Sequence, residues 1–272
     1  MPELPEVETT RRGIAPHLVG RSLREITVRN ARLRLPVPSD LDFLLHQRVT
    51  ELTRRSKYLL VTFEHGERLL IHLGMSGSLR ICESDREVRK HDHVIFTLED
   101  GKELRFHDPR RFGMVLPIGR GDPSTHALLS HLGPEPLGPD FTPEGLYTAV
   151  HLRKAAIKIV IMDAKVVVGV GNIYANEALF RSGIRPSTPA NRVSRMRMSS
   201  LHAAIITVLQ ESIEQGGTTL RDFVNSDGQP GYFRQRLDVY DRTGEPCRRC
   251  QTPILHAVMG QRSTFWCPRC QK

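Results

Sequence analysis

The 272-residue sequence contains no run of 18 apolar residues, so it offers no candidate for a membrane-spanning helix. Its first residues, MPELPEVETTRR, lack the apolar segment that follows a basic start in secretory signals. The cysteines number five, and an odd count argues against a secreted domain held by disulfides. Walker and dinucleotide-binding glycine patterns are also absent. These absences favour an intracellular protein that uses no nucleotide cofactor.

Positive charge is abundant and unevenly placed. Lys and Arg total 39 against 30 Asp and Glu, which gives a net charge of +9. Residues 229–272 hold eight basic and three acidic residues, so +5 of this charge lies in the last 44 positions. The excess of positive charge indicates an anionic partner. Charge alone does not decide whether this partner is nucleic acid, an anionic membrane surface or an acidic protein. Aromatic residues interleave with the basic ones in this segment, and that pattern favours nucleic acid.

The same segment contains the spacing of a zinc site. Two C-x2-C pairs are separated by sixteen residues, and their members are Cys247, Cys250, Cys267 and Cys270. Four cysteines close a tetrahedral coordination sphere, so we expect one structural Zn²⁺ with no catalytic task, bound to a β-hairpin within 252–266. Spacing alone does not fix the metal's identity, and a redox-active C-x2-C pair is the weaker alternative. Cys82, in an apolar strand-like run, is expected in the core.

Hydrophobic periodicity changes twice along the chain and predicts an α+β protein. A helix is expected over 3–18, followed by short β-type runs at 26–28, 58–63, 68–73, 94–98, 103–106 and 114–116. Hairpin-type turns between the runs suggest an antiparallel sandwich or barrel. A Pro- and Gly-rich stretch at 133–143 predicts a linker, and helices are expected at 144–152, 155–162, 173–182 and 195–215.

Pro2 is the first residue with potential chemistry. Removal of Met1 would leave it as a secondary amine, which can attack a sugar carbon and form a cationic iminium. Glu3 and Glu6 lie beside it at a helix N-terminus, where one could act as an acid or base. A retained Met1 would make the Pro2 nitrogen an amide without nucleophilicity.

The start MPELPEVET resembles that of the formamidopyrimidine-DNA glycosylases, bacterial enzymes that remove 8-oxoguanine and ring-opened purines. Further motifs resemble the same family and follow its order along the whole chain. They are RRSKYLL (54–60), HLGMSG (72–77), KHDH (90–93), DPRRFG (108–113), HLGPEP (131–136), VGVGNIYA (168–175), QGGTT (215–219), DGQPGY (227–232) and the four-cysteine ribbon.

This resemblance implies a fold and its boundaries. We expect an N-terminal helix plus antiparallel β-sandwich in a catalytic domain at 1–133, then a helical helix–two-turn–helix domain at 134–228. A zinc β-ribbon at 229–272 completes the chain. Residues 217–232 resemble the family's damage-recognition loop, although their composition suits a plain linker equally well.

The resemblance also implies roles for single residues. Pro2 would attack C1′ of the damaged nucleotide, Glu3 would protonate the opening sugar, and Lys57 would be the general acid of β-elimination. From composition alone, Lys57 is an ordinary surface lysine after a basic pair. Arg262, on the ribbon hairpin, would grip phosphate and assist δ-elimination.

Other residues resemble the family's DNA contacts. His91, Arg110 and Lys154 match its DNA-binding positions, and Asn172 matches the phosphate contact between the two helices. Met75, Arg110 and Phe112 resemble the wedge that fills the gap left when a nucleotide is flipped out of the duplex. Ordinary core packing is the alternative role for Met75 and Phe112.

The function implied is a bifunctional DNA glycosylase and abasic-site lyase, working as a monomer in the bacterial cytoplasm in association with the nucleoid. Its partner would be damaged double-stranded DNA, with no membrane and no small-molecule cofactor. Two other functions stay open. An endonuclease VIII-type enzyme for oxidised pyrimidines would share Pro2, Glu3 and the lysine, and a non-catalytic zinc-ribbon protein would share only the binding surface.

Overall fold

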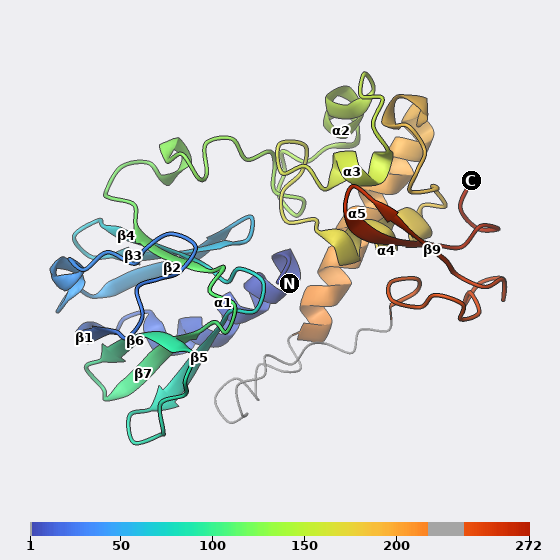
Figure 1. Cartoon of the computed structure of the whole chain (residues 1–272). Helices are drawn as coiled ribbons and strands as arrows, with labels where there is room; N and C mark the ends of the chain where they lie inside the picture. Colours follow the sequence, from blue (N-terminus) through green and yellow to red (C-terminus); the bar gives the residue numbers. More distant parts are fainter. Residues whose placement is uncertain (1, 217–236) are drawn as a thin grey trace. The chain divides into compact units, whose positions relative to one another are not determined.

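The computed structural model describes residues 2–216 and 237–272, and these residues form two compact units (Figure 1). Of the described residues, the first unit contains 2–130 and 215–216, and the second contains 131–214 and 237–272. None of the helices in the described part of the chain has both the length and the apolar character that a membrane span requires.

The first unit is a β-sandwich with one long helix. Helix α1 (Leu4–Leu18) precedes two antiparallel four-stranded sheets, whose strand orders are β1-β6-β7-β5 and β2-β3-β4-β8. The strands are β1 (Leu23–Val28), β2 (Val49–Arg55), β3 (Tyr58–Phe63), β4 (Arg68–His72), β5 (Ser78–Glu83), β6 (Asp92–Leu98), β7 (Lys102–His107) and β8 (Met114–Pro117). Short 3-10 turns lie at Asp42–Leu44 and Pro123–Thr125. The predicted N-terminal helix and antiparallel β-sandwich are confirmed.

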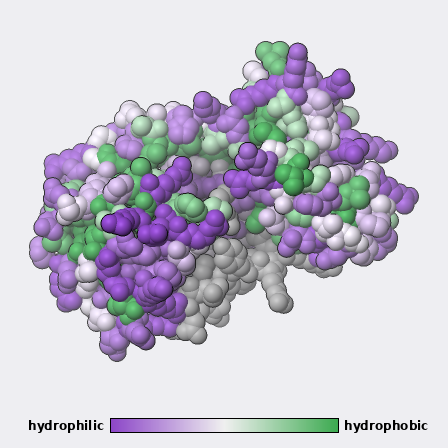
Figure 2. Space-filling model, in the orientation of Figure 1, coloured by the Kyte–Doolittle hydropathy of each residue, from purple (hydrophilic) through white to green (hydrophobic). Residues whose placement is uncertain are grey.

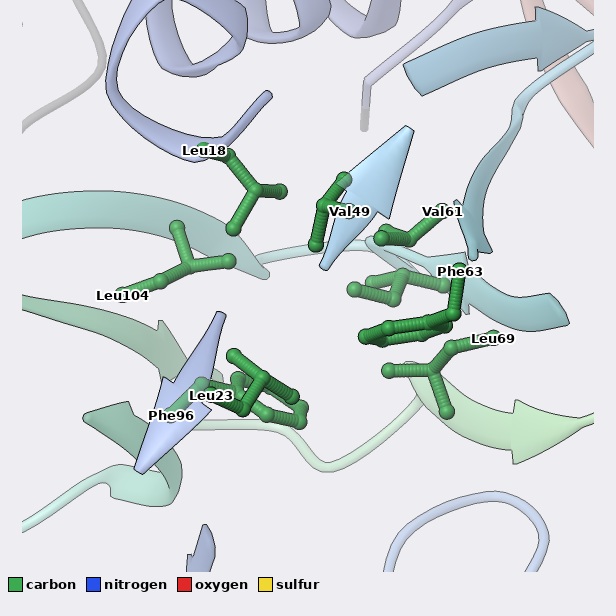
Figure 3. A pocket seen from close by; sticks show the side chains of 9 residues that line it. Leu18, Leu23, Val49, Val61, Phe63, Leu69, Phe96 and Leu104 are labelled. Atoms are coloured by element: carbon green, nitrogen blue, oxygen red, sulfur yellow. The ribbon is translucent and has the colours of Figure 1, made fainter. Parts of the chain in front are cut away.

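The core of this unit lies between the sheets and α1. Figure 3 shows apolar side chains from the helix and from both sheets pointing toward one another around a small gap. The nine residues that line it are Leu18, Leu23, Val49, Val61, Phe63, Leu69, Ile71, Phe96 and Leu104. No polar group faces this gap, so it belongs to the packing of the core and offers no means of recognising a substrate. On the face seen in Figure 2, hydrophilic residues predominate and hydrophobic patches are small and scattered.

One strand was missed by the periodicity. The sequence of β2, VTELTRR, buries only Val49 and Leu52, so its apolar signal is too sparse to identify a strand. Backbone pairing with β3 holds it instead, in a register that runs from Val49↔Phe63 to Arg55↔Tyr58. Cys82 is 4% exposed on β5, as expected for a core residue.

The second unit is helical and ends in a two-stranded ribbon. It contains α2 (Pro143–Val150), α3 (Ile157–Ile161), α4 (Asn172–Arg181), α5 (Arg195–Gly216), a 3-10 turn (Ala190–Arg192) and the antiparallel pair β9 (Leu255–Met259) and β10 (Arg262–Trp266). All four predicted helices and the predicted hairpin are present. Helix α3 is shorter than expected at its start, because Ala156 instead forms an isolated β-bridge with Pro189.

The Pro- and Gly-rich stretch at 133–143 has no helix or strand before α2 but is fastened to the second unit. The N–H of Gly133 donates to the Ala164 carbonyl at 2.8 Å, and Phe141 is buried in the helical core. The domain boundaries at 133/134 and 228/229 remain predictions, and the second of them lies outside the described residues.

Candidate functional site

The strand registers bring three sequence motifs to one end of the β-sandwich. Tyr58 pairs with His72, and His72 pairs with Met114. The Lys57 turn therefore precedes β3 at the same end where β4 leads into the turn containing Met75. The turn containing Arg110 and Phe112 leads into β8 at this end as well.

Helix α1 brings the N-terminus to that end. Arg11 Nη1 donates to the Leu52 carbonyl at 3.3 Å, and Arg54 Nε donates to Glu8 Oε2 at 3.2 Å. Earlier residues of α1 thus contact later residues of β2, so the helix runs antiparallel to this strand. Extending this antiparallel relation places Pro2 and Glu3 toward the end of β2, where the turn with Lys57 begins.

Glu3 is held in place by capping the helix. Its backbone N–H donates to Glu6 Oε2 at 2.7 Å, and its side chain accepts from the Glu6 backbone N–H. This capping box uses two donors of the helix terminus, and Pro5 sits in the first turn, where a missing N–H costs little. Pro2 and Glu3 are both buried, Glu3 to 2% exposure. The candidate nucleophile and acid are thereby fixed to a rigid helix start.

Lys57 lies at the tip of the two-residue hairpin between β2 and β3. Ser56, beside it, has φ 56°, in the left-handed region that non-glycine residues seldom adopt. Burial first, and then the charges of Lys57 and Arg34, lower the pKa of His72 to about 4. The Gly74 N–H donates to His72 Nδ1 at 3.0 Å, so the neutral ring carries its proton on Nε2. Sequence reasoning missed His72, although it sits in the HLGMSG motif.

The three wedge candidates come from two turns in close contact. Gly74 has φ +66°, and a Cβ there would lie 2.4 Å from the Phe112 carbonyl carbon, so only glycine lets the turns approach. Met75 is half-buried, and Phe112 keeps 43% exposure. The Arg110 guanidinium lies 5.1 Å from the centre of the Phe112 ring. Because Phe112 is exposed at a turn and contacts a cation, it is not part of the core. Core packing, the alternative role for Phe112, is therefore wrong.

Buried Asp108 organises this pair of turns. Its Oδ1 accepts the Ser76 hydroxyl at 2.7 Å, and its Oδ2 accepts the Gly113 N–H at 2.8 Å. The Asp108 N–H in turn donates to the His91 carbonyl at 3.0 Å, which places His91 next to the wedge candidates. Sequence reasoning missed this role of Asp108, whose only signal was its place before Pro-Arg-Arg.

Arg262 and Asn172 are brought together in the second unit. Arg262 is exposed at the start of β10, directly after a turn formed by Gly260 and Gln261. Both turn residues have positive φ, 55° and 59°, as a type I′ hairpin requires. Asn172 Nδ2 donates to the carbonyl of Ser263, next to Arg262, at 3.0 Å. The Asn172 side chain therefore holds the ribbon, and its backbone at the first turn of α4 is the part suited to an anion.

Lys158 and Asn176 also hold the ribbon and were missed by sequence reasoning. Lys158 is fully buried, and its Nζ donates to the Ser263 carbonyl at 2.8 Å and to Thr264 Oγ1 at 2.7 Å. Asn176 Oδ1 accepts the Phe265 N–H at 2.8 Å. Lys154, the predicted DNA contact, lies exposed in the turn before α3, so the two lysines have different surroundings.

The four cysteines form a metal centre. Their Sγ atoms all lie within 4.8 Å of one another, with Cys247–Cys270 at 3.9 Å and Cys250–Cys267 at 3.4 Å. Tetrahedral Zn²⁺ with Zn–S bonds of about 2.3 Å needs sulfur atoms roughly 3.8 Å apart, so the set fits zinc. Backbone N–H groups of Arg249 and Cys270 donate to ligand sulfurs at 3.4 Å. This is one structural zinc site, as predicted.

Comparison with known proteins agrees with these arrangements. The N-terminal domain of formamidopyrimidine-DNA glycosylase matches residues 1–115, and the H2TH domain of the same enzyme matches residues 132–224. A zinc finger found in FPG and IleRS matches residues 244–272. The chain belongs to the formamidopyrimidine-DNA glycosylase family. The resemblance stated from the sequence is confirmed, and so is the expected order of sandwich, helix–two-turn–helix and zinc ribbon.

Relatives in this family match over their full length. The formamidopyrimidine-DNA glycosylases of Methylococcus capsulatus and Alcanivorax borkumensis are 56% and 55% identical, with 100% of each chain covered. The crystal structure of the Thermus thermophilus protein is 40% identical with a TM-score of 0.85, covering 99% of this chain and 98% of that one. A Lactococcus lactis family member bound to abasic-site DNA is 31% identical with a TM-score of 0.91, covering 99% of each chain. The expected damage-recognition loop, 217–232, lies outside the described residues.

Proposed function

We propose that this family member is a bifunctional DNA glycosylase that excises oxidised purines from duplex DNA and then cuts the strand at the resulting abasic site. The observation that carries the proposal is the meeting of Pro2 and Glu3, Lys57 and the wedge turns at one end of the sandwich. Full-length relatives that bear the glycosylase name support the same activity. Damaged double-stranded DNA is the substrate.

The first chemical step needs the lesion outside the base stack. Flipping costs a few kcal/mol, and Met75 and Phe112 would offset part of this cost by filling the gap, while Arg110 bonds the orphaned partner base. With Met1 removed, the Pro2 nitrogen attacks C1′, and the bond between C1′ and the damaged base breaks. Glu3 delivers a proton to the ring oxygen as the C1′–O4′ bond opens. A cationic iminium between Pro2 and the opened sugar results.

Strand cleavage then follows from the iminium. Loss of a C2′ proton lets the 3′ phosphate leave in β-elimination, and a second elimination releases the 5′ phosphate. Lys57 acts as a general acid in base removal and again in the first elimination, which Pro2 still supports without it. Arg262 grips the phosphate and assists the second elimination. A one-nucleotide gap remains. Hydrolysis of the iminium between Pro2 and the remaining sugar fragment then frees the enzyme. The closed four-cysteine site leaves the zinc no open position, so its task is to fold the ribbon.

Phosphate contacts would hold the duplex in register. His91 and Arg110 on the first unit, and Arg262 and Lys154 on the second, supply cationic or hydrogen-bonding side chains. The backbone N–H groups at the first turn of α4, beside Asn172, suit an anion as well. We further propose that the protein acts as a monomer in the bacterial cytoplasm, at the nucleoid that holds its substrate. The molar mass measured by light scattering at working concentration tests whether the protein is a monomer.

Oxidised pyrimidines are a second candidate substrate. A solved structure of the Lactococcus lactis family member, 31% identical and covering 100% of both chains at a TM-score of 0.90, contains oxidised-pyrimidine DNA. The test is a set of matched duplexes carrying 8-oxoguanine, a formamidopyrimidine or thymine glycol, with single-turnover rates of base removal and gel analysis of the ends. The proposal expects faster removal of both purine lesions and a one-nucleotide gap. Faster removal of thymine glycol would favour the endonuclease VIII-type activity, and binding without cleavage of any duplex would contradict catalysis.

A further inference from the structure

An ion-pair cluster around the buried residue Glu8 joins α1 to the hairpin that carries Lys57. Glu8, on α1, accepts from three arginines: Arg11 and Arg12 at 2.8 Å, and Arg54 on β2 at 3.2 Å. Although burial raises the pKa of the Glu8 carboxyl, hydrogen bonds from Arg11 and Arg12 and the nearby positive charges lower it to about 2. Glu8 is therefore an anion at any pH at which the protein works.

Arg54 is the member of this cluster that reaches the hairpin tip. Its Nε donates to Glu8 Oε2, and its Nη1 donates at 2.8 Å to the carbonyl of Ser56. The side chains of Arg54 and Glu8 are each only 11% exposed, so water screens this contact little. One planar guanidinium thus connects the catalytic helix with the residue that immediately precedes Lys57.

We propose that Arg54, held by Glu8, is a positioning residue that sets Lys57 relative to Pro2 and Glu3. The inference rests on the proposed function, since it concerns the placement of that function's groups. Ser56 occupies the left-handed region at φ 56°, a backbone state that persists only where the surroundings enforce it. The Arg54 hydrogen bond to the Ser56 carbonyl is such an enforcing contact. Without it the two-residue tip relaxes, and Lys57 shifts while the strands remain paired.

The size of the effect follows from how sharply catalysis depends on placement. A shift of about 1 Å in a catalytic group can cost up to about 100-fold in rate. We therefore expect Arg54→Gln to slow removal of 8-oxoguanine by roughly 10- to 100-fold. Arg54→Lys keeps the charge but lacks the planar fork that spans both acceptors, so it should lie between Arg54→Gln and the unmodified protein.

The chain offers a matched control. Arg12 donates to the same Glu8 carboxylate at the same 2.8 Å as Arg11, but its side chain is 47% exposed. Its partner Glu8 lies on the same helix, one turn away. Arg12→Gln thus removes a cation from Glu8 and leaves the bond between Arg54 and Ser56 intact. It should change the rate of base removal by less than about 2-fold, because exposed pairs of this kind contribute little.

A double-mutant cycle with Lys57→Ala separates positioning from general stability. Single-turnover rates of 8-oxoguanine removal are measured at 25 °C for the full-length protein with Arg54→Gln, Lys57→Ala and both changes, and thermal unfolding is recorded for each. If Arg54 acts through Lys57, Arg54→Gln has little further effect once Lys57 is alanine. Should Arg54→Gln fail to fold, the cycle is run with Arg54→Lys.

Three other outcomes would overturn the inference. An equal slowing by Arg54→Gln in both backgrounds would show that Arg54 acts independently of Lys57. Unchanged activity of Arg54→Gln beside an impaired Lys57→Ala would show that the tip holds its position without the arginine. Full activity of Lys57→Ala itself would remove the proposed role of Lys57, and the failure would then lie in the proposed function.

Discussion

Lys158→Met is the change that most clearly tests how the zinc ribbon is held. Methionine keeps the length and much of the volume of the lysine but removes both donors to β10, at the Ser263 carbonyl and at Thr264 Oγ1. Each hydrogen bond from a charged donor contributes about 1.5–3 kcal/mol. Removing a buried cation also relieves its desolvation cost, so the net loss should be roughly 2–3 kcal/mol.

The loss should appear as easier local opening of the ribbon. At about 1.4 kcal/mol per tenfold change, amide exchange protection in β10 should fall roughly 30- to 140-fold. The Phe265 amide is the best probe, because it is buried and donates to Asn176. The assay is hydrogen exchange of the zinc-loaded protein, read by mass spectrometry of the ribbon peptides, with zinc content measured in parallel.

Lys154→Met is the control, at a lysine four residues earlier in the chain and outside α3. Lys154 is exposed, so its loss should leave the exchange of β10 unchanged while weakening DNA binding through a lost phosphate contact. Unaltered exchange in Lys158→Met, with its zinc retained, would refute the conclusion that this lysine fastens the ribbon to the helices.

Four further outcomes are expected. Arg262→Ala should weaken DNA binding and lower the salt slope of log K by about 1, measured by fluorescence anisotropy; an unchanged slope would remove its phosphate contact. Lys57→Ala should slow base removal more for some lesions than for others in single-turnover assays, yet leave substantial cleavage of a preformed abasic site, because Pro2 persists. Chelation of zinc should unfold the ribbon and abolish tight DNA binding, since a small cysteine-lined core cannot fold without its metal; tight binding by demetallated protein would contradict this. Glu8 has a folded pKa of about 2 against 4.5, so its stabilisation is complete above pH 4.5 and is lost as the pH falls toward 2. Glu8→Gln should flatten that part of a plot of unfolding free energy against pH, and an unflattened plot would contradict the assigned ion pairs.

Local patterns predicted most of the fold. Hydrophobic periodicity predicts helix α1, the apolar strands of both sheets and the long helix α5. The cysteine spacing predicts the ribbon. Strand β2 is not predicted by periodicity, because a mostly polar segment is held in the sheet by backbone pairing and only two buried side chains. The start of α3 is misjudged because a bridge between Ala156 and Pro189 overrides helix propensity.

The candidate site divides in a similar way. Residues that carry chemistry, such as Pro2 and Lys57, stand in motifs that sequence comparison recognises. Residues that hold those groups in place are not recognisable in this way, because their function depends on contacts between segments that are distant in the sequence. Arg54 meets Glu8 across 46 positions, and Lys158 meets Thr264 across 106. Both look like ordinary surface cations in the sequence and become informative only when the fold buries them.

The central claim is that the Pro2 nitrogen bonds covalently to the sugar of a damaged purine nucleotide. The most direct measurement is borohydride trapping on a duplex with one 8-oxoguanine opposite cytosine, followed by mass spectrometry of the N-terminal peptide. The mechanism predicts a reduced adduct on Pro2 in a chain that lacks Met1. A protein that binds this duplex tightly and excises the base but gives no adduct on Pro2 would contradict it.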